Sequence, residues 1–454
     1  MFGNINPEEV INENFVIHCP KVKIIHKKSL LFSGYGTIRK NKLLTYYVEL
    51  ICLEDNYKFE YGEIEDFFID LPKQPCDDVD KLYAEFTTTD GDILTSSDFI
   101  INISVIPLPH GTYRTIKFLV PYVLYEEEKL LEEKNSIQYR FLEKIKIPTN
   151  KINSITSTTG VNSSKKNESD IPLATFDVKI RSETDYTLVS ANGDFEIEPT
   201  MEAINFYLAF SGGTLPQPYF LTYSTGNKKS IKLISINNQN VNKKSSDPIP
   251  ESFAKRGKLT TDYSFNFLEK IITLKNEKPG TFDTLQTHWK RVWQSTQSSN
   301  DICKLVLSVA IEGLLNDVYI PEFKIKFINQ KTIDDIAIIK KMISKLETEA
   351  YYKDRLKNSI SYLNEMTSSK ALDVLINENI LTTSDKTIWT KMRNSAAHPK
   401  GNMEKQNDDH LDIRVCFDLF HKIILNIIGY EGPVVCFGSN KKNEITIIEY
   451  KKVI

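Results

Sequence analysis

The sequence predicts an α+β multidomain protein, in which a β-rich N-terminal region is followed by an all-α helical bundle and a short terminal hairpin. Three observations predict it. The chain has 454 residues, which suits several domains of about 150 residues each. Runs of β-branched and aromatic residues, separated by turn residues, dominate the chain up to residue 280. From residue 281 the spacing of apolar residues becomes helical.

Composition excludes several classes of protein. Hydrophobic residues make up 41% of the chain, which is enough to build cores, and 57 basic residues nearly balance 60 acidic ones. The chain is therefore not a polybasic protein of the histone type. Its six cysteines form no Cys-x-x-Cys pair, so we expect no zinc site, no disulfide framework and a cytoplasmic location. No apolar run is long enough to span a membrane, and residues 1–16 lack the apolar core of a secretory signal.

The first expected domain covers residues 1–147. Its apolar runs predict strands at 15–17, 22–25, 43–53 and 115–123. Residues 122–146 are acidic and leucine-rich with helical spacing, which predicts a helix. Ser, Thr and Asn dominate residues 148–172, which predicts a flexible linker or surface loop.

Residues 173–280 are expected to form a second β-rich (α+β) segment of the same N-terminal region. Residues 175–180 alternate as a strand does, and residues 201–210 have a helical period. Basic side chains gather between residues 226 and 258, either as a solvated loop or as a patch that contacts phosphates. In the second interpretation the RNA-binding residues are Lys228, Lys229, Lys243, Lys244 and Arg256.

Residues 281–454 form the expected helical domain. Trp289 and Trp293 are four residues apart and predict its first packed helix. Residues 302–315 are apolar nearly all round, which predicts a central buried helix. Further elements are expected as helices at 333–346, 352–363, 371–376 and 388–392, a long helix capped by Asp408 or Asp409 and ended by Gly429, and a hairpin at 433–437 and 444–450.

Segment 389–401, Trp-Thr-Lys-Met-Arg-Asn-Ser-Ala-Ala-His-Pro-Lys-Gly, presents Arg393, Asn394 and His398 near a helix end. On a continuous helix, Arg393 and His398 would lie about 140° apart and share no face. His398 precedes Pro399, however, and a residue before proline disfavours the helical conformation. We therefore expect the helix to end near His398, which would let both side chains line one cleft.

An arginine and a histidine suffice for RNA cleavage by internal transfer, because the ribose 2′-hydroxyl already lies beside the phosphate. His398 would act as general base or acid, and Arg393 would stabilise the charge that builds on the phosphate oxygens. No metal and no cofactor are expected. In the alternative interpretation Arg393 is a surface or ion-paired residue, and His398 caps the helix end.

These features together resemble the HEPN superfamily, and more closely the HEPN domain of ApeA-type proteins of bacterial antiphage defence. The resemblance rests on three segments. They are Ala-Ile-Glu-Gly-Leu-Leu at 310–315, Arg-Asn-x3-His at 393–398, and Ile-Gly-Tyr-Glu-Gly-Pro at 428–433, where the last helix ends. The likeness covers residues 281–454. Upstream of residue 281 it extends only to a strand-rich region that would sense or gate.

The resemblance implies a HEPN helical bundle that forms a homodimer, in which two motifs face each other as one metal-independent endoribonuclease site. By position, Arg393 and His398 match the family's catalytic pair, and Asn394 matches the polar residue after the arginine. The implied partners are RNA, either host tRNA or phage RNA, and a phage-derived activator. Glu312, inside an apolar helix, is costly unless paired. It either orients Arg393 or His398, or faces a polar gap or solvent.

Two other functions remain open at this point. The helical domain could be a non-catalytic dimerisation or RNA-binding module, with the N-terminal region responsible for recognition. The basic stretch would then matter more than His398. Alternatively, N-terminal carboxylates could form a metal-dependent nuclease, and chelation of the metal would then abolish activity.

Overall fold

A computed structural model describes most of the chain. It covers residues 2–55, 81–108, 111–128, 134–146, 148–156, 162–183, 186–236, 247–250, 253–255, 258–327, 330–362, 365–397, 406–438 and 444–448. The chain divides into two compact units. The first comprises Met1–Ile145, Thr149–Met201 and Pro216–Asn242, and the second comprises Lys146–Pro148, Glu202–Leu215 and Lys243–Ile454. The chain therefore enters the second unit three times.

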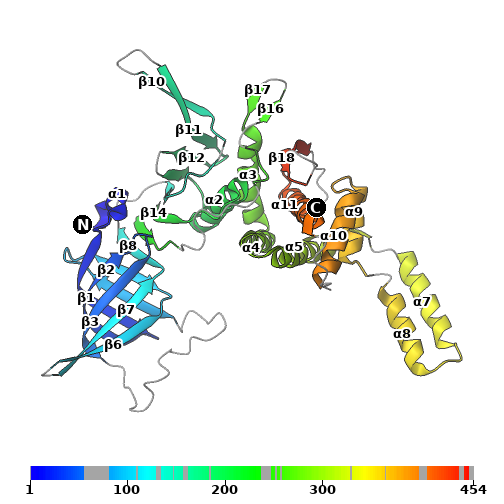
Figure 1. The fold of residues 1–454 in the computed structure, drawn as a ribbon, viewed down its shortest axis with the longest axis horizontal. Coiled ribbons are helices and arrows are strands. Elements are labelled where there is room, and N and C mark those ends of the chain that lie inside the picture. Colours follow the sequence, from blue (N-terminus) through cyan, green and yellow to red (C-terminus); the bar gives the residue numbers. More distant parts are fainter. Residues whose placement is uncertain are drawn as a thin grey trace. The chain divides into compact units, whose positions relative to one another are not determined.

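The first unit is built on one antiparallel sheet (Figure 1). Among the described residues, its 15 strands pair in the order β10-β11-β12-β13-β9-β14-β15-β8-β5-β4-β1-β2-β3-β7-β6. They are β1 (Val16–His26), β2 (Ser29–Lys40), β3 (Tyr46–Asp55), β4 (Leu82–Thr87), β5 (Ile93–Ser97), β6 (Ile101–Leu108), β7 (Gly111–Val120), β8 (Tyr122–Glu128), β9 (Asn135–Phe141), β10 (Lys151–Thr156), β11 (Asn162–Pro172), β12 (Phe176–Ser182), β13 (Thr187–Gly193), β14 (Pro218–Thr225) and β15 (Lys228–Ile234). A short helix, α1 (Pro7–Ile11), precedes them.

Alternating side chains give the strands one buried and one exposed face. In β12, Phe176, Val178 and Ile180 are buried, while the polar residues between them are exposed. The phenylalanines Phe99 and Phe118 stack within the core of this unit, with ring centroids 4.6 Å apart. Burial of one face therefore helps to set the register of β12.

Residues 122–146 do not form the expected helix, because they hold strands β8 and β9. The glutamates of β8 lie opposite the lysines of β15. Lys228 Nζ is 2.7 Å from Glu126 Oε1, and Lys229 Nζ is 3.5 Å from Glu127 Oε1. These cross-strand ion pairs and the ladder between the strands outweigh the local helical spacing.

Residues 148–172 are not a linker over their described length, since strands β10 and β11 occupy them at one end of the sheet order. Asn150 explains part of this pairing. Its side-chain amide donates to the backbone oxygen of Asp170 over 2.7 Å, and its side-chain oxygen accepts from the backbone N–H of Asp170 over 2.9 Å. Polar composition did not exclude strands here, because a ladder is built from backbone groups that every residue except proline supplies in full.

The second unit is helical. Its helices are α2 (Ile197–Gly212, of which residues 202–212 belong here), α3 (Asp262–Glu277), α4 (Pro279–Ser295), α5 (Asn300–Leu314), α6 (Ile320–Phe327), α7 (Gln330–Ser344), α8 (Ala350–Ser361), α9 (Ser368–Asn377), α10 (Thr383–Ala397) and α11 (Gln406–Ile428), with a π-helical turn at Leu315–Tyr319. Two hairpins, β16 (Phe253–Lys255) with β17 (Lys258–Thr260) and β18 (Gly432–Cys436) with β19 (Glu444–Ile448), complete it. An α+β architecture with a terminal hairpin is thus confirmed.

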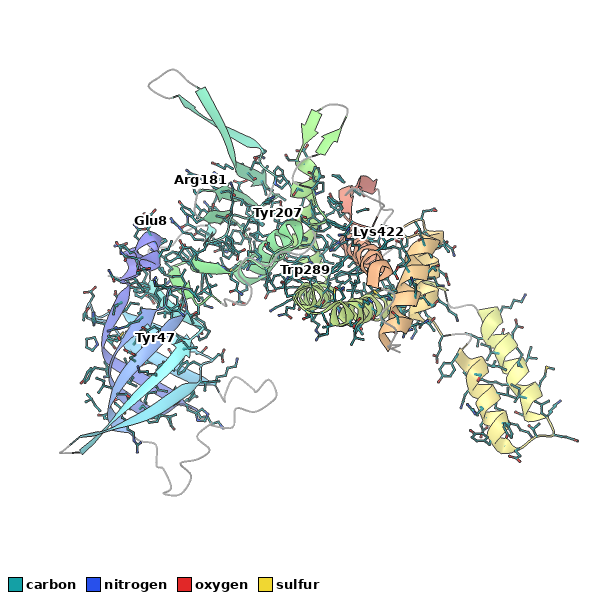
Figure 2. The ribbon with its side chains drawn as sticks, viewed as in Figure 1. Glu8, Tyr47, Arg181, Tyr207, Trp289 and Lys422 are labelled. Carbon is teal, nitrogen blue, oxygen red and sulfur yellow. The ribbon has the colours of Figure 1, made fainter. Side chains whose placement is uncertain are left out.

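The helical core extends upstream of the boundary expected at residue 281. Phe206 and Phe210 of α2 pack against Trp289 of α4, with ring centroids 6.0 and 6.4 Å apart, and Phe267 of α3 lies 5.6 Å from Phe210. Figure 2 labels Tyr207 and Trp289 among the side chains of this unit. Helices α2 and α3 therefore belong to the helical core.

The ends of α11 differ in how well the sequence predicted them. The helix ends as expected at Gly429, whose φ of 73° is open to glycine at little cost. At its other end, Asp408 and Asp409 are not caps, because α11 already includes them. No helix in the described part of the chain is both long and apolar enough to cross a membrane.

Candidate functional site

Helix α10, which carries Arg393 and Asn394, begins with two reciprocal hydrogen bonds. The backbone N–H of Thr382 donates to Asp385 Oδ2 over 2.8 Å, and the backbone N–H of Asp385 donates to Thr382 Oγ1 over 3.2 Å. This arrangement is a capping box, which satisfies donors that the first turn leaves free. Lys422 of α11 adds an ion pair to the same carboxylate, with Nζ 3.2 Å from Asp385 Oδ2. The start of α10 is therefore fixed to α11.

Further along, α10 packs against α5 and α11. Trp389 and Met392 are buried, and the indole N–H of Trp389 donates to the backbone oxygen of Ser308 on α5 over 3.5 Å. Lys391 Nζ lies 2.8 Å from Asp412 Oδ2 on α11. The buried face of α10 thus determines which side chains point outward, and Arg393 and Asn394 are among the exposed ones.

Arg393 is held by two groups. Its Nη2 donates to Glu312 Oε1 on α5 over 2.6 Å, and its guanidinium carbon lies 5.6 Å from the ring centroid of Trp389, one helical turn earlier. Even so, 48% of its side chain remains exposed. Arg393 therefore combines a fixed direction with access for a ligand.

Helices α5 and α4 approach each other closely next to Glu312. A Cβ on the next residue, Gly313, would lie 2.4 Å from His288 Cε1 on α4, so any larger residue there would require the imidazole of His288 to move. Directly afterwards the chain makes the π-helical turn at Leu315–Tyr319. Such turns frequently occur at functional sites. The glycine and the turn together set where α5 presents Glu312.

The structure brings together only part of the predicted site. Glu312 and Arg393 meet, and Asn394 is exposed beside Arg393 on α10. His398 lies outside the described residues, and so do Lys243, Lys244 and Arg256.

Two of the basic residues considered for RNA binding lie in the first unit. Lys228 and Lys229 are on β15, where they pair with Glu126 and Glu127 of β8. Lys229 Nζ also donates to the backbone oxygen of Gly3 over 2.8 Å. Arg393 and Glu312 belong to the second unit, so these lysines and the arginine are not part of one compact unit.

Helix α5 carries an exposed apolar stripe that sequence reasoning placed in the core. Ile302, Leu305 and Val309 are all exposed, with 54% of Val309 accessible. Their spacing of three and four residues puts them on the face of α5 that also holds Glu312. On the opposite side, Leu307 and Ile311 are fully buried. Apolar spacing alone could not tell a core face from a surface that awaits a partner.

Within the described residues, no group of three or more His, Cys, Asp or Glu side chains is arranged to hold a metal ion.

Comparison with known proteins leaves the geometry as the basis for interpretation. The chain matches no protein-family model, no curated protein and no solved structure.

Proposed function

We propose that the chain is a cytoplasmic, metal-independent endoribonuclease of bacterial antiphage defence, with a HEPN-type helical unit that works as a homodimer. The observation that carries the proposal is Arg393, which is oriented by Glu312 and Trp389 and is half exposed. A fixed guanidinium with free N–H donors suits a phosphate whose charge increases during a reaction. Asn394 beside it offers a neutral donor and acceptor.

The chemistry needs a proton carrier in addition to the arginine. In the proposed reaction the ribose 2′-oxygen attacks the adjacent phosphorus, and the bond from phosphorus to the 5′-oxygen breaks. His398 takes the 2′-hydroxyl proton, and an imidazolium returns a proton to the departing 5′-oxygen. Arg393 stabilises the phosphate oxygens between these steps. The second copy supplies a second arginine and histidine, so base and acid come from different subunits.

The exposed stripe on α5 supports a second copy at this place. Ile302, Leu305 and Val309 form a continuous apolar surface that ends at Glu312 on the same helix face. Contiguous apolar patches on a protein surface mark sites of interaction. A second copy that covers the stripe would bring two Arg393 side chains near one interface.

The test measures cleavage of host tRNA and phage RNA in EDTA. It uses the wild type, Arg393→Ala, His398→Ala and Glu312→Gln, with Arg414→Ala as a control for the loss of an exposed arginine. We expect Arg393→Ala and His398→Ala to lose about 10²–10⁴-fold in rate. Glu312→Gln keeps a hydrogen-bond acceptor and should lose less. Equal activity in all variants, or activity that requires magnesium, would overturn the mechanism.

A second function is favoured by the same ion pair. Because Glu312 partly neutralises Arg393, the arginine could serve packing in a non-catalytic HEPN dimerisation or RNA-binding module. This function predicts RNA binding that survives His398→Ala, with no cleavage by the wild type under any trigger. Loss of cleavage in EDTA would instead indicate a metal-dependent nuclease.

A further inference from the structure

Helices α7 and α8 form a hairpin with little core of its own (Figure 1). Only Ile336 and Ile343 of α7 are buried among the described side chains of the pair, and α8 has no buried residue. By contrast, large apolar side chains are exposed on both helices. They are Ile338, Ile339 and Met342 on α7, Leu346 just after it, and Tyr351, Tyr352 and Leu356 on α8.

Such a hairpin needs another partner for its apolar face. Its helices have 15 and 12 residues, and helices this short are marginal without tertiary packing. The exposed fractions of Ile338 and Met342, which lie one turn apart in the second half of α7, are 57% and 63%. The apolar face is therefore a docking surface, and the charges around it indicate what docks.

Those charges are self-complementary. Asp335, Ile338 and Met342 of α7, together with Lys345 in the turn directly after its end, follow one another at spacings of three, four and three residues, as in the seam of an antiparallel helix pair. When a second copy of the segment is laid antiparallel about residue 340, Ile338 faces Met342 of the partner subunit. In the same register Asp335 faces Lys345 of the partner subunit, at both ends of the pair.

We propose that α7 packs antiparallel against α7 of a second copy of this chain, so that the two hairpins form a four-helix bundle. The surface is distinct from the α5 stripe and does not depend on the ribonuclease chemistry. An isologous contact of this kind is the commonest way in which two identical chains associate. Acidic residues lie toward the start of α7 and most basic residues toward its end, which suits an antiparallel copy, whereas an anionic lipid surface would call for basic residues alone.

The test exchanges the charges of the seam in the full-length chain and measures association by sedimentation velocity. Asp335→Lys and Lys345→Asp each place like charges opposite one another twice, and we expect each to weaken self-association about tenfold. The double variant should restore the wild-type association. An equimolar mixture of the two single variants should do the same, because each then meets the opposite charge. Asp354→Lys on α8, which makes the same charge change away from the seam, is the control.

Rescue can come only from contact between copies. Asp335 lies in α7 and Lys345 directly after its end, about 15 Å further along the chain, so the two cannot meet within one chain. Equal association of all the proteins, or a mixture that associates as weakly as its components, would overturn the proposal. RNA cleavage is not part of the measurement, so the result is independent of the fate of Arg393 chemistry. Unchanged thermal unfolding of the variants verifies that each is folded.

Discussion

At the scale of single residues, the ion pair between Glu312 and Arg393 serves mainly to orient the guanidinium of Arg393. The pair is partly exposed, and such pairs contribute at most about 1 kcal/mol to stability. A guanidinium has five N–H donors, and one bond to Glu312 leaves others for a phosphate. The carboxylate of Glu312 thus orients Arg393 and leaves N–H donors available, which is what a phosphate-binding residue needs.

His421 on α11 is a second residue with an unusual environment. It is buried among Phe210, Phe417 and Phe420, and its Nδ1 has no hydrogen-bond partner among the described residues. Burial lowers the pKa of His421 from 6.5 to about 3. The folded protein therefore keeps this imidazole neutral at pH values where the unfolded chain is protonated.

This depressed pKa predicts a loss of stability in acid. Between pH 6.5 and about 3 the unfolded chain binds the extra proton, so the free energy of unfolding falls as the pH falls, by up to about 1.4 kcal/mol per pH unit. Above pH 6.5 His421 is neutral in both the folded and the unfolded chain, so it no longer lowers the free energy of unfolding. Urea titrations of the wild type and of His421→Leu at pH 7 and pH 5 measure it. A variant with the same pH dependence as the wild type would contradict the assignment.

Single-residue predictions from sequence were limited by distance along the chain. The sequence identified Glu312 as a costly carboxylate and Arg393 as a phosphate-binding candidate, but the two are 81 positions apart. Only the packing of α5 against α10 brings them within 2.6 Å. The burial of His421 could not be predicted from the sequence, because it depends on Phe210, in a helix that sequence reasoning assigned to the N-terminal region.

At the scale of elements, one side chain of the capping box, Asp385, both caps α10 and links it to α11. Asp385 satisfies the first turn of α10 and also accepts an ion pair from Lys422 of α11. Its carboxylate is almost fully buried. Removal would leave a largely buried ammonium unpaired and the first turn uncapped.

We therefore expect Asp385→Ala to lower the free energy of unfolding by about 2–4 kcal/mol. Asp373→Ala is the matched control, because Asp373 also pairs with a lysine, Lys386 at 2.6 Å, but is itself exposed. That control should cost less than about 1 kcal/mol. Chemical denaturation measures both, and equal losses would show that the capping box is not the origin of the effect.

Elements were predictable where one pattern dominated. The last helix and its stop at Gly429 followed from apolar spacing and a glycine. Strands β8 and β9 were mistaken for a helix because glutamates and leucines carry helical spacing in that segment. Lysines on the neighbouring strand, such as Lys228, favour the strand conformation of β8, and they are about a hundred residues away in sequence. A local helical pattern therefore mispredicts a segment whose conformation is set by strand partners far away in the sequence.

At the scale of the whole molecule, the chain is not a simple succession of domains. It leaves the sheet after β13, contributes most of α2 to the helical unit, and returns to the sheet at β14. A boundary drawn where helical spacing begins, at residue 281, therefore divides the helical core. Composition could not reveal this, because α2 is a single helix between strands. Its aromatic partners follow it by 57 residues, at Phe267, to 211 residues, at His421, both counted from Phe210.

A fragment of residues 281–454 is expected not to fold cooperatively. It lacks Phe206, Phe210 and Phe267, whose rings cover Trp289, His421 and Tyr430 in the full chain. Loss of several buried aromatic contacts exceeds the stability of a typical domain, since each costs about 3–5 kcal/mol. Calorimetry of the fragment and of the full chain tests this. A sharp transition in the fragment would show that α2 and α3 are dispensable.

The position of α2 in the chain also bears on synthesis. Phe206 and Phe210 leave the ribosome early, yet α11, which supplies His421 to cover Phe210, is complete only at residue 428. At about 5–20 residues per second, that interval lasts roughly ten to forty seconds. Through this time the apolar helix α2 lacks its final partners. A nascent chain of this kind is a natural client for chaperones that shield apolar segments during translation.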